Sequence, residues 1–403
     1  HVAGVDVGLA ICEDVWQDHG PLEDLAPGHP GLVVVINGSP FERDKDDVRI
    51  PLISRQAQEL NAHIAYVNLV GGQDDLVFDG DSLMIDADQK LIGRGKQFDE
   101  DLLLFDITSK REIAAVSDIA SHKQDDNWQI WNALVLGLRD YVNKNNFKSV
   151  ILGLSGGIDS AVCAALAVDA LGSHRVFGVS MPSKYSSDHS KSDAFDLAKR
   201  LGINIRTEPI KGAVKELEKQ LKLKDTSAEN LQARVRGTIL MSLSNQEGHL
   251  TLTTGNKTEL AVGYSTIYGD SVGGFAPLKD VAKTLVWQLA KWRNDWATQQ
   301  GQPAPIPENS ISKPPSAELR PGQVDQDSLP PYDVLDEILD AYIERKLGRE
   351  QIKALGFDSA TVDRVVGLVD RAEWKRRQGA IGPKITGMAF GRDRRLPITN
   401  KYS

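Results

Sequence analysis

Strand-like and helix-like segments alternate along the chain beyond residue 127, and this alternation restricts the fold more than any other feature of the sequence. An order of strand, helix, strand needs crossover connections, so it predicts an α/β fold with a parallel, doubly wound sheet. Short apolar runs predict strands at 149–154, 176–181, 203–209 and 249–254. Apolar residues at helical spacing predict helices at 128–141, 159–171, 188–201, 228–244 and within 332–379.

Residues 1–110 show a second α/β layer pattern, which predicts a separate domain. Strands are expected at 5–11, 32–36, 64–69, 82–85 and 102–106, with a helix at 49–61. The polar residues that follow predict a linker at 111–126, so that the second domain covers 127–403. The stretch 299–331 is crowded with Pro, Gly, Gln and Ser. It predicts a long loop of the kind that often forms a lid.

Composition and charge exclude several classes of protein. A hydrophobic fraction of 41% and a charged fraction of 26% are typical of a soluble globular chain, and no apolar run is long enough for a membrane span. The net charge of −9 argues against a general nucleic-acid binder, which would be basic. Two cysteines, Cys12 and Cys163, provide no disulfide framework, so we expect a cytoplasmic protein.

The hexapeptide SGGIDS at 155–160 lies between a predicted strand and a predicted helix. Gly156 and Gly157 would let the backbone approach a phosphate, and the helix N-terminus supplies N–H groups. Ser155 and Ser160 can donate hydrogen bonds, while Asp159 would hold a cation that bridges phosphates. The lysine of the usual P-loop is missing, so the alternatives are another type of phosphate loop or an ordinary glycine-rich turn.

After such a strand, SGGIDS resembles the pyrophosphate loop of the ATP-pyrophosphatase family. Members of that family cleave ATP between the α- and β-phosphates and adenylate a substrate. They include NAD⁺ synthetases, GMP synthetases, asparagine synthetases and tRNA-modifying enzymes, and the loop alone does not choose among them. The resemblance implies an adenine-nucleotide α-hydrolase-like fold for residues 127–403, ATP as co-substrate and Mg²⁺ as cofactor.

Six further segments resemble NAD⁺ synthetases. They read NLQARVR at 230–236, TTGNKTE at 253–259, GYSTIYGD at 263–270, PLKDVAK at 277–283, PSAEL at 315–319 and WKRR at 374–377. The resemblance implies that ATP contacts Ser155, Gly156, Gly157, Asp159, Ser160, Thr254, Lys283 and Ser316. It implies that nicotinate adenine dinucleotide (deamido-NAD⁺) contacts Asn230, Arg234, Glu259 and Lys375, and that Mg²⁺ is held by Asp159 and Glu259.

The residue types suit the reaction that this resemblance implies, in which a nicotinate carboxylate attacks the α-phosphate of ATP and ammonia then attacks the adenylate. Mg²⁺ and Lys283 would offset the developing negative charge. Taken singly, Lys283, Arg234 and Lys375 read equally well as surface cations, and Glu259 as an acid at a helix start. Together and in order they favour an NAD⁺ synthetase. Ile267 stands where the ammonia-only members have Lys, which favours the glutamine-dependent branch.

A cysteine follows the first predicted strand, in the segment LAICEDVW at 9–16. Such a turn can expose sulfur near helical N–H groups, although a buried structural cysteine is the plainer interpretation. The segment resembles the nucleophile turn of the nitrilase superfamily, and NGSPF follows the next strand as it does in nitrilase-type glutaminases. The resemblance makes 1–110 the C-terminal half of such a domain. It assigns catalysis to Cys12 and glutamine binding to Ser39 and Lys45.

Several expectations stay open at this stage. The Glu and Lys of a nitrilase triad would precede His1, so we expect upstream residues. Competing interpretations are another ATP-pyrophosphatase amidotransferase such as a GMP synthetase, and a nitrilase-type hydrolase whose second domain only binds adenine nucleotide. A non-enzymatic binding protein is a third. The expected partners are deamido-NAD⁺, ATP and glutamine, with no nucleic acid, no membrane and a homo-oligomeric assembly.

Overall fold

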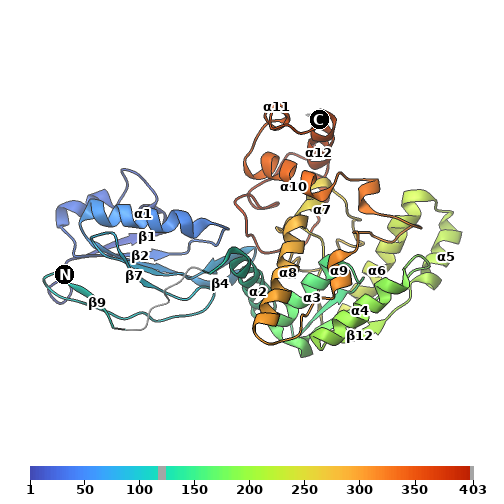
Figure 1. Cartoon of the computed structure of the whole chain (residues 1–403), viewed down its shortest axis with the longest axis horizontal. Helices are drawn as coiled ribbons and strands as arrows, with labels where there is room; N and C mark the ends of the chain where they lie inside the picture. Colours follow the sequence, from blue (N-terminus) through green and yellow to red (C-terminus); the bar gives the residue numbers. More distant parts are fainter. Residues whose placement is uncertain (117–123, 400–403) are drawn as a thin grey trace. The chain divides into compact units, whose positions relative to one another are not determined.

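The computed structural model describes residues 1–116 and 124–399. The chain divides into two compact units, His1–Leu136 and Gly137–Ser403, each with its own sheet (Figure 1). The expected linker at 111–126 falls partly on 117–123, which lie outside the described residues. No helix in the described ranges is long and apolar enough to cross a bilayer.

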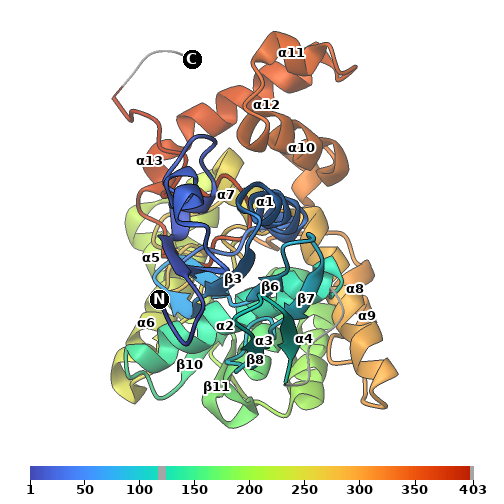
Figure 2. The same ribbon diagram turned by 90° about the vertical axis from the view of Figure 1, so that its left-hand side faces the viewer.

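The first unit contains a five-stranded mixed sheet in the order β1-β2-β3-β6-β7. The strands β1, β2 and β3 are parallel, whereas β6 and β7 are antiparallel to their neighbours. Helix α1 lies along one face of the sheet (Figures 1 and 2). The elements span β1 Val7–Ile11, β2 Leu32–Asn37, α1 Lys45–Leu60, β3 His63–Asn68, β6 Leu83–Ile85 and β7 Leu91–Arg94.

The two faces of β1, β2 and β3 differ in burial because successive side chains point to opposite sides of a strand. Val35 and Ile64 pack into the core that Ile53 of α1 completes. On the opposite face, Leu9 is 70% exposed and Ile11 68% exposed. Ile36, Val67 and Leu69 are also exposed there or at the strand end. This sheet therefore presents an uncovered apolar face within the described part of the chain.

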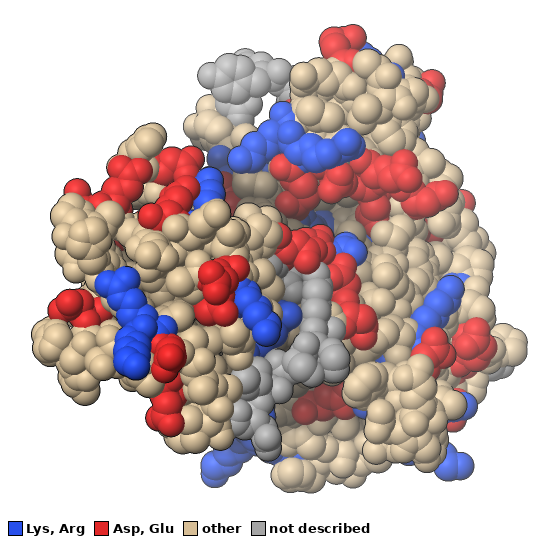
Figure 3. Space-filling view, turned by 60° about the vertical axis from the view of Figure 1, so that its left-hand side comes forward, with Lys and Arg blue, Asp and Glu red and all other residues tan. Residues whose placement is uncertain are grey.

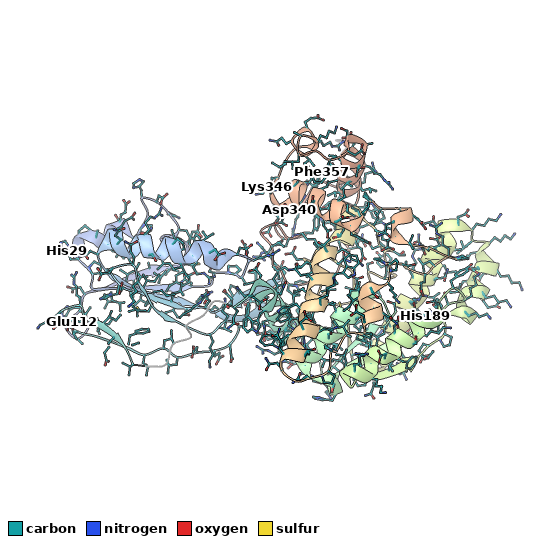
Figure 4. The ribbon with its side chains drawn as sticks, in the orientation of Figure 1. His29, Glu112, His189, Asp340, Lys346 and Phe357 are labelled. Carbon is teal, nitrogen blue, oxygen red and sulfur yellow. The ribbon has the colours of Figure 1, made fainter. Side chains whose placement is uncertain are left out.

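Short elements complete the first unit. The 3₁₀ helix η1 (Cys12–Val15) follows β1 directly, and η2 is Glu23–Gly28. Two hairpins pair β4 (Val70–Gln73) with β5 (Leu76–Asp79) and β8 (Phe105–Ile107) with β9 (Ile113–Ala115). His29 and Glu112 lie at one end of the unit, where Arg111 donates a hydrogen bond to the carbonyl of His29 (Figure 4).

The second unit contains a four-stranded parallel sheet in the order β12-β11-β10-β13. The chain passes from β10 to β12 in one direction and then returns to β13, so right-handed crossovers place α3 and α4 on one face and α6 on the other. This is the predicted doubly wound sheet. The elements are β10 Val150–Gly153, α3 Ile158–Leu171, β11 Val176–Ser180, α4 Asp188–Leu201, β12 Asn204–Thr207, α5 Lys211–Leu221, α6 Asp225–Glu247 and β13 Leu250–Thr251.

The strand order reverses between β10 and β13, and such a switch point leaves a crevice at the carboxyl ends of the two strands. The SGGIDS loop follows β10, and Thr253 and Thr254 follow β13. Parallel topology thus brings together two segments that are about a hundred residues apart in sequence. Their meeting point positions the candidate site.

Helices C-terminal to this sheet form a second core. Residues of α7 pack against α10 and α12, through contacts such as Ala261 with the cluster around Leu335 and Val365. Asp340, Lys346 and Phe357 lie in this C-terminal region (Figure 4). Helix α2 (Asp126–Lys144) precedes the sheet. The helices that follow it are α7 Lys257–Val262, α8 Lys283–Gln299, α9 Glu308–Ser312, α10 Tyr332–Leu339, the π-helix η5 Asp340–Glu344, α11 Arg349–Lys353, α12 Ser359–Arg371 and α13 Glu373–Arg376.

Several predicted element boundaries were wrong. The strand expected at 249–254 is reduced to Leu250–Thr251, because the chain there turns into the site. The strand expected at 102–106 begins only at Phe105. The long loop at 299–331 contains α9 and a 3₁₀ turn at Asp325–Asp327. Helix α5 and strands β4, β5 and β7 were not predicted, since they are short or amphipathic without a distinctive turn residue.

Candidate active sites

The SGGIDS loop has the geometry of an anion cradle. Gly156 has φ +75°, and a Cβ on it would lie 2.4 Å from the carbonyl oxygen of Ser190, so only glycine fits. The hydroxyl of Ser160 donates to the carbonyl of Gly157 at 3.0 Å, and the N–H of Gly157 donates to Ser155 Oγ at 3.2 Å. The first turn of α3 adds N–H groups that the helix itself cannot satisfy.

One lysine and two carboxylates form the charged centre beside this loop. Lys283 begins α8 and is only 1% exposed. Its Nζ lies 2.5 Å from Asp159 Oδ2 and 3.2 Å from Glu259 Oε1. Asn256 donates from Nδ2 to the other oxygen of Asp159 at 2.9 Å. The predicted residues Asp159, Glu259 and Lys283 therefore meet in three dimensions, although they come from α3, α7 and α8.

Burial and mutual charge shift the pKa values of this centre. Burial raises the pKa of Glu259 to about 8, with Lys283 lowering it and Asp159 raising it. Burial lowers the pKa of Lys283, but Asp159 and Glu259 raise it by more, so the net shift is upward. Two acids thus share one buried ammonium group. An incoming polyanion would compete with them for Lys283, because the same cation attracts all three.

A layer of hydroxyl and carboxyl groups lies behind the charged centre and was not predicted. Tyr332 donates from its hydroxyl to Asp325 Oδ2 at 2.7 Å, and Tyr264 donates to Asp325 Oδ1 at 3.3 Å. The ammonium of Lys283 lies 5.4 Å from the ring centroid of Tyr332. Burial and the nearby carboxylates raise the pKa of Tyr332. Its hydroxyl therefore remains a donor.

A cavity of about 320 Å³ opens between the SGGIDS loop, β13 and the segment 310–319, within the size range of small-molecule sites. Predicted residues that line it are Ser155, Gly157, Asp159, Ser160, Thr254, Glu259, Lys283 and Ser316. Lining residues that were not in the predicted set include Ser190, Arg236, Tyr264, Glu318 and Asp325. The predicted residues Gly156, Asn230, Arg234 and Lys375 do not line this cavity.

Three of these four residues hold the neighbouring segment 263–270. Asn230 accepts a hydrogen bond from the hydroxyl of Thr266 at 2.8 Å, and Arg234 donates to the carbonyl of Ile267 at 3.2 Å. Lys375 donates to the carbonyls of Gly263 and Ser265 at 2.7 and 2.9 Å. The segment that resembles a substrate loop is therefore tied down from α6 and from α13.

The segment expected to be a lid closes over one side of the cavity. Glu318 Oε1 accepts hydrogen bonds from Ser187 Oγ at 2.9 Å and Ser190 Oγ at 2.6 Å, at the start of α4. The hydroxyl of Ser316 is exposed and donates to the carbonyl of Gln323 at 2.5 Å, within the segment itself. The carboxylate of Glu318 therefore occupies a position where hydroxyls and helical N–H groups favour negative charge.

In the first unit, Cys12 lies at the predicted turn. It follows β1, opens η1 and has φ +44°, a strained backbone conformation for a side chain other than glycine. Its side chain is half-buried and free of any disulfide. A turn at the carboxyl end of a parallel strand holds this thiol where a nucleophile can meet a substrate.

The two predicted glutamine-binding residues follow the adjacent strand β2. Ser39 is buried, and its N–H donates to Asn68 Oδ1 at 2.9 Å. Lys45 donates from Nζ to the carbonyl of Pro40 at 2.9 Å and lies 5.9 Å from the ring centroid of Trp16. Trp16 follows the helical turn that Cys12 opens. The structure thus brings the 39–45 segment to the end of the sheet where Cys12 lies.

Acidic and basic side chains are interspersed over the described residues on the face drawn in Figure 3. Long polyanions bind best to a continuous basic surface. The charges that matter for a small phosphate ligand, around Lys283, are instead buried in the cavity.

Two comparisons, with a protein-family model and with known protein sequences, indicate the same family. The model of the NAD synthase family matches residues 130–379. A glutamine-dependent NAD(+) synthetase from Acinetobacter baylyi is 48% identical over 412 aligned residues, which cover 99% of this chain and 74% of that protein.

Solved structures agree with the sequence comparison. A glutamine-dependent NAD⁺ synthetase from Acinetobacter baumannii, in complex with ADP, is 44% identical with a TM-score of 0.73, covering 98% of this chain and 73% of its own. A glutamine-dependent NAD(+) synthetase from Cytophaga hutchinsonii has a TM-score of 0.79 at 23% identity, covering 99% of this chain and 72% of its own. The latter likeness concerns the fold.

Proposed function

The chain belongs to the glutamine-dependent NAD⁺ synthetases, and from that premise we propose how its residues carry out the family's reaction. The enzyme forms NAD⁺ from deamido-NAD⁺ with ATP, taking nitrogen from glutamine. The observation that carries the proposal is the buried Lys283 beside a glycine-rich phosphate loop, in a cavity of suitable size. The family match favours neither alternative, a GMP synthetase or a nitrilase-type hydrolase whose second domain only binds adenine nucleotide.

ATP is bound in the cavity of the second unit. The SGGIDS loop and the first turn of α3 would hold its phosphates through backbone N–H groups and hydroxyls. Lys283 would leave its present ion pairs and bind phosphate oxygen, which neutralises charge as pyrophosphate departs. The proposed ATP contacts are Ser155, Gly156, Gly157, Asp159, Ser160, Thr254, Lys283 and Ser316.

Mg²⁺ fits the carboxylates that face this loop. Among the described residues no cluster of three or more His, Cys, Asp or Glu side chains could hold an ion. Mg²⁺, however, typically takes one or two carboxylates together with substrate phosphates. Asp159 and Glu259 would supply those carboxylates once Lys283 turns to the phosphates. The ion would then add Lewis-acid stabilisation of the phosphates.

Deamido-NAD⁺ is proposed to bind beside ATP, along segment 263–270. Support comes from the hydrogen bonds that Asn230, Arg234 and Lys375 make to that segment, which leave it pre-shaped for a ligand. Glu259, with its raised pKa, would meet the nicotinate end. The nicotinate carboxylate attacks the α-phosphate of ATP, pyrophosphate leaves, and ammonia then displaces AMP from the adenylate. Positioning does most of this work.

Glutamine is proposed to supply the ammonia in the first unit. The sulfur of Cys12, as thiolate, would attack the side-chain amide carbon of glutamine; ammonia leaves and a glutamyl thioester forms, which water then hydrolyses to glutamate. Ser39 and Lys45 would bind the glutamine. Domain limits of 1–110 and 127–403, a homo-oligomeric state and a cytoplasmic location remain predictions from the sequence.

A product assay tests the synthetase reaction. The enzyme with ATP, Mg²⁺, ammonium and deamido-NAD⁺ should form NAD⁺, AMP and pyrophosphate in equal amounts. Omission of deamido-NAD⁺ should stop pyrophosphate release, which serves as the control. Release of ADP and phosphate instead of AMP and pyrophosphate would contradict the adenylate route.

A further inference from the structure

The main chain of Ser39 is held by a single side-chain amide. Asn68, the last residue of β3, accepts the N–H of Ser39 on Oδ1 at 2.9 Å and donates from Nδ2 to the carbonyl of Ser39 at 3.1 Å. The amide therefore pairs with both polar groups of one residue, as a neighbouring strand would. Both partners are buried, so neither bond can be replaced by water without rearrangement.

The charged side chain of Asp79 fixes the orientation of the Asn68 amide. Its Nδ2 also donates to Asp79 Oδ1 at 3.1 Å. Asp79, at the end of β5, receives both terminal nitrogens of Arg49, at 3.2 and 3.4 Å. With an acceptor on one side and a donor on the other, a flipped amide would face like groups at every contact. Asp79 thus selects the amide orientation that suits Ser39.

Arg49 is the rigid base of this arrangement. It lies on α1, is fully buried, and also lies 3.6 Å from Asp81, which pairs with Arg94 at 2.5 Å. Burial lowers the pKa of Arg49, but Asp79, Tyr66 and Asp81 together raise it by more, so the net shift is upward. Alternating charges of this kind are stable only while every partner is present.

The rest of the Ser39 turn is held by backbone and by a predicted ligand-binding residue. The N–H of Phe41 donates to the carbonyl of Val77 at 2.7 Å, and Lys45 reaches the carbonyl of Pro40. Lys45 lies one helical turn before Arg49, so the same face of α1 carries both. Through these contacts α1 and β5 fix the two residues that follow Ser39.

We propose that Asn68 is a positioning residue for glutamine capture, held in place by Asp79 and Arg49. The inference rests on the proposed role of Ser39 and names the residues that set its geometry before glutamine arrives. Pre-organisation of a binding group lowers the cost of association. Loss of Asn68 should therefore weaken glutamine binding more than it slows the chemistry at Cys12.

The test compares variants of the intact enzyme with two nitrogen sources. Asn68→Ala should raise KM for glutamine about ten-fold or more, with a much smaller change in kcat, since two buried hydrogen bonds to Ser39 are lost. Asn68→Asp should raise it further, because a carboxylate oxygen would face Asp79 and the carbonyl of Ser39. Arg49→Lys keeps the charge but loses the paired bonds, so a smaller rise is expected.

A matched control lies at the other end of the same strand. His63 is 6% exposed and Asn68 7% exposed, and the His63 side chain makes two hydrogen bonds, to the backbone of Arg111 and of Ala87. His63→Ala should cost similar thermal stability but leave KM for glutamine unchanged. All variants should retain ammonium-dependent NAD⁺ formation, which reports that the second unit is intact.

The outcomes separate this inference from the glutaminase assignment. If Cys12→Ala retains glutamine-dependent activity, the assignment of the glutamine site fails and the inference fails with it. If Cys12→Ala loses that activity while Asn68→Ala keeps the normal KM for glutamine, only the positioning role is overturned. An equal rise of KM in Asn68→Ala and His63→Ala would also overturn it, because it would indicate general loosening of β3.

Discussion

Both candidate sites lie at the carboxyl ends of parallel strands, yet they differ in where their buried charges lie. In the second unit, Lys283, Asp159 and Glu259 line the cavity itself. In the first unit, the charges of Arg49 and its partners are buried behind the Ser39 turn, and a neutral amide separates them from it.

The difference follows from the two reactions. A reaction between ATP and a carboxylate gathers negative charge, so cations must reach the reacting atoms. Amide transfer to a thiol starts from a neutral amide carbonyl and depends on alignment of the nucleophile. Charges placed behind such a site can fix the position of the Ser39 turn without lying next to the nucleophile. Mutations in the two units should therefore impair different activities of the enzyme.

The largest expected effect separates the units completely. Cys12→Ala should reduce glutamine-dependent NAD⁺ formation by about 10⁴-fold or more, since no other group replaces the nucleophile. Formation with ammonium should stay within about two-fold, because the ATP site lies in a separate unit. Both rates are measured as NAD⁺ produced by the same preparation. A parallel fall of both would mean that Cys12 supports the fold and not the chemistry.

A variant in the second unit should lose less activity, but it should lose it with both nitrogen sources. Lys283→Ala removes the ammonium group that pairs with both Asp159 and Glu259, so kcat should fall about 10²- to 10³-fold with either nitrogen source. Lys291→Ala, on the exposed face of the same helix, is the control and should be near normal. A fall of kcat with glutamine but not with ammonium would contradict the assignment of Lys283 to the ATP reaction.

The smallest effect concerns the pH dependence of stability. The pKa of Glu259 is raised to about 8, so the folded state retains a proton that the unfolded state releases near its ordinary pKa. Its contribution to stability therefore falls as pH rises from about 4.5 to about 8. Glu259→Gln removes this contribution. Between pH 6 and 8.5 the apparent Tm of the ligand-free variant should fall a few degrees less than that of the parent.

Differential scanning calorimetry in the two buffers measures this difference. Glu308→Gln, at the start of α9 and outside the charged centre, should follow the parent at both pH values. Identical pH slopes for Glu259→Gln and the parent would show that Glu259 is ionised across the range.

The sequence predicted those parts of each site that are formed by neighbouring residues of one segment. The SGGIDS loop between a strand and a helix could be found because phosphate binding needs consecutive small residues and a helix start. The doubly wound order could be found because strand and helix patterns alternate. Cys12 could be found because it follows an apolar strand in a segment that resembles the nitrilase nucleophile turn, and Ser39 was assigned through the same resemblance.

The remaining parts depend on contacts between distant segments. Nothing local shows that Lys283 lies between Asp159 and Glu259, or that Tyr332 supports Asp325. Arg49 belongs to an ordinary amphipathic helix pattern, and the partners that surround it, Asp79, Asp81 and Tyr66, come from distant segments. The loop at 299–331 was expected as a lid, but the hydrogen bonds of Glu318 could not be anticipated from it.

The face of β1 and β2 that is uncovered among the described residues affects how this chain behaves during purification. Leu9, Ile11 and Ile36 offer branched side chains to water on one continuous sheet surface. Salts such as ammonium sulfate strengthen the association of apolar surfaces. The chain should therefore be retained strongly on phenyl resin at moderate salt and leave it only near low ionic strength.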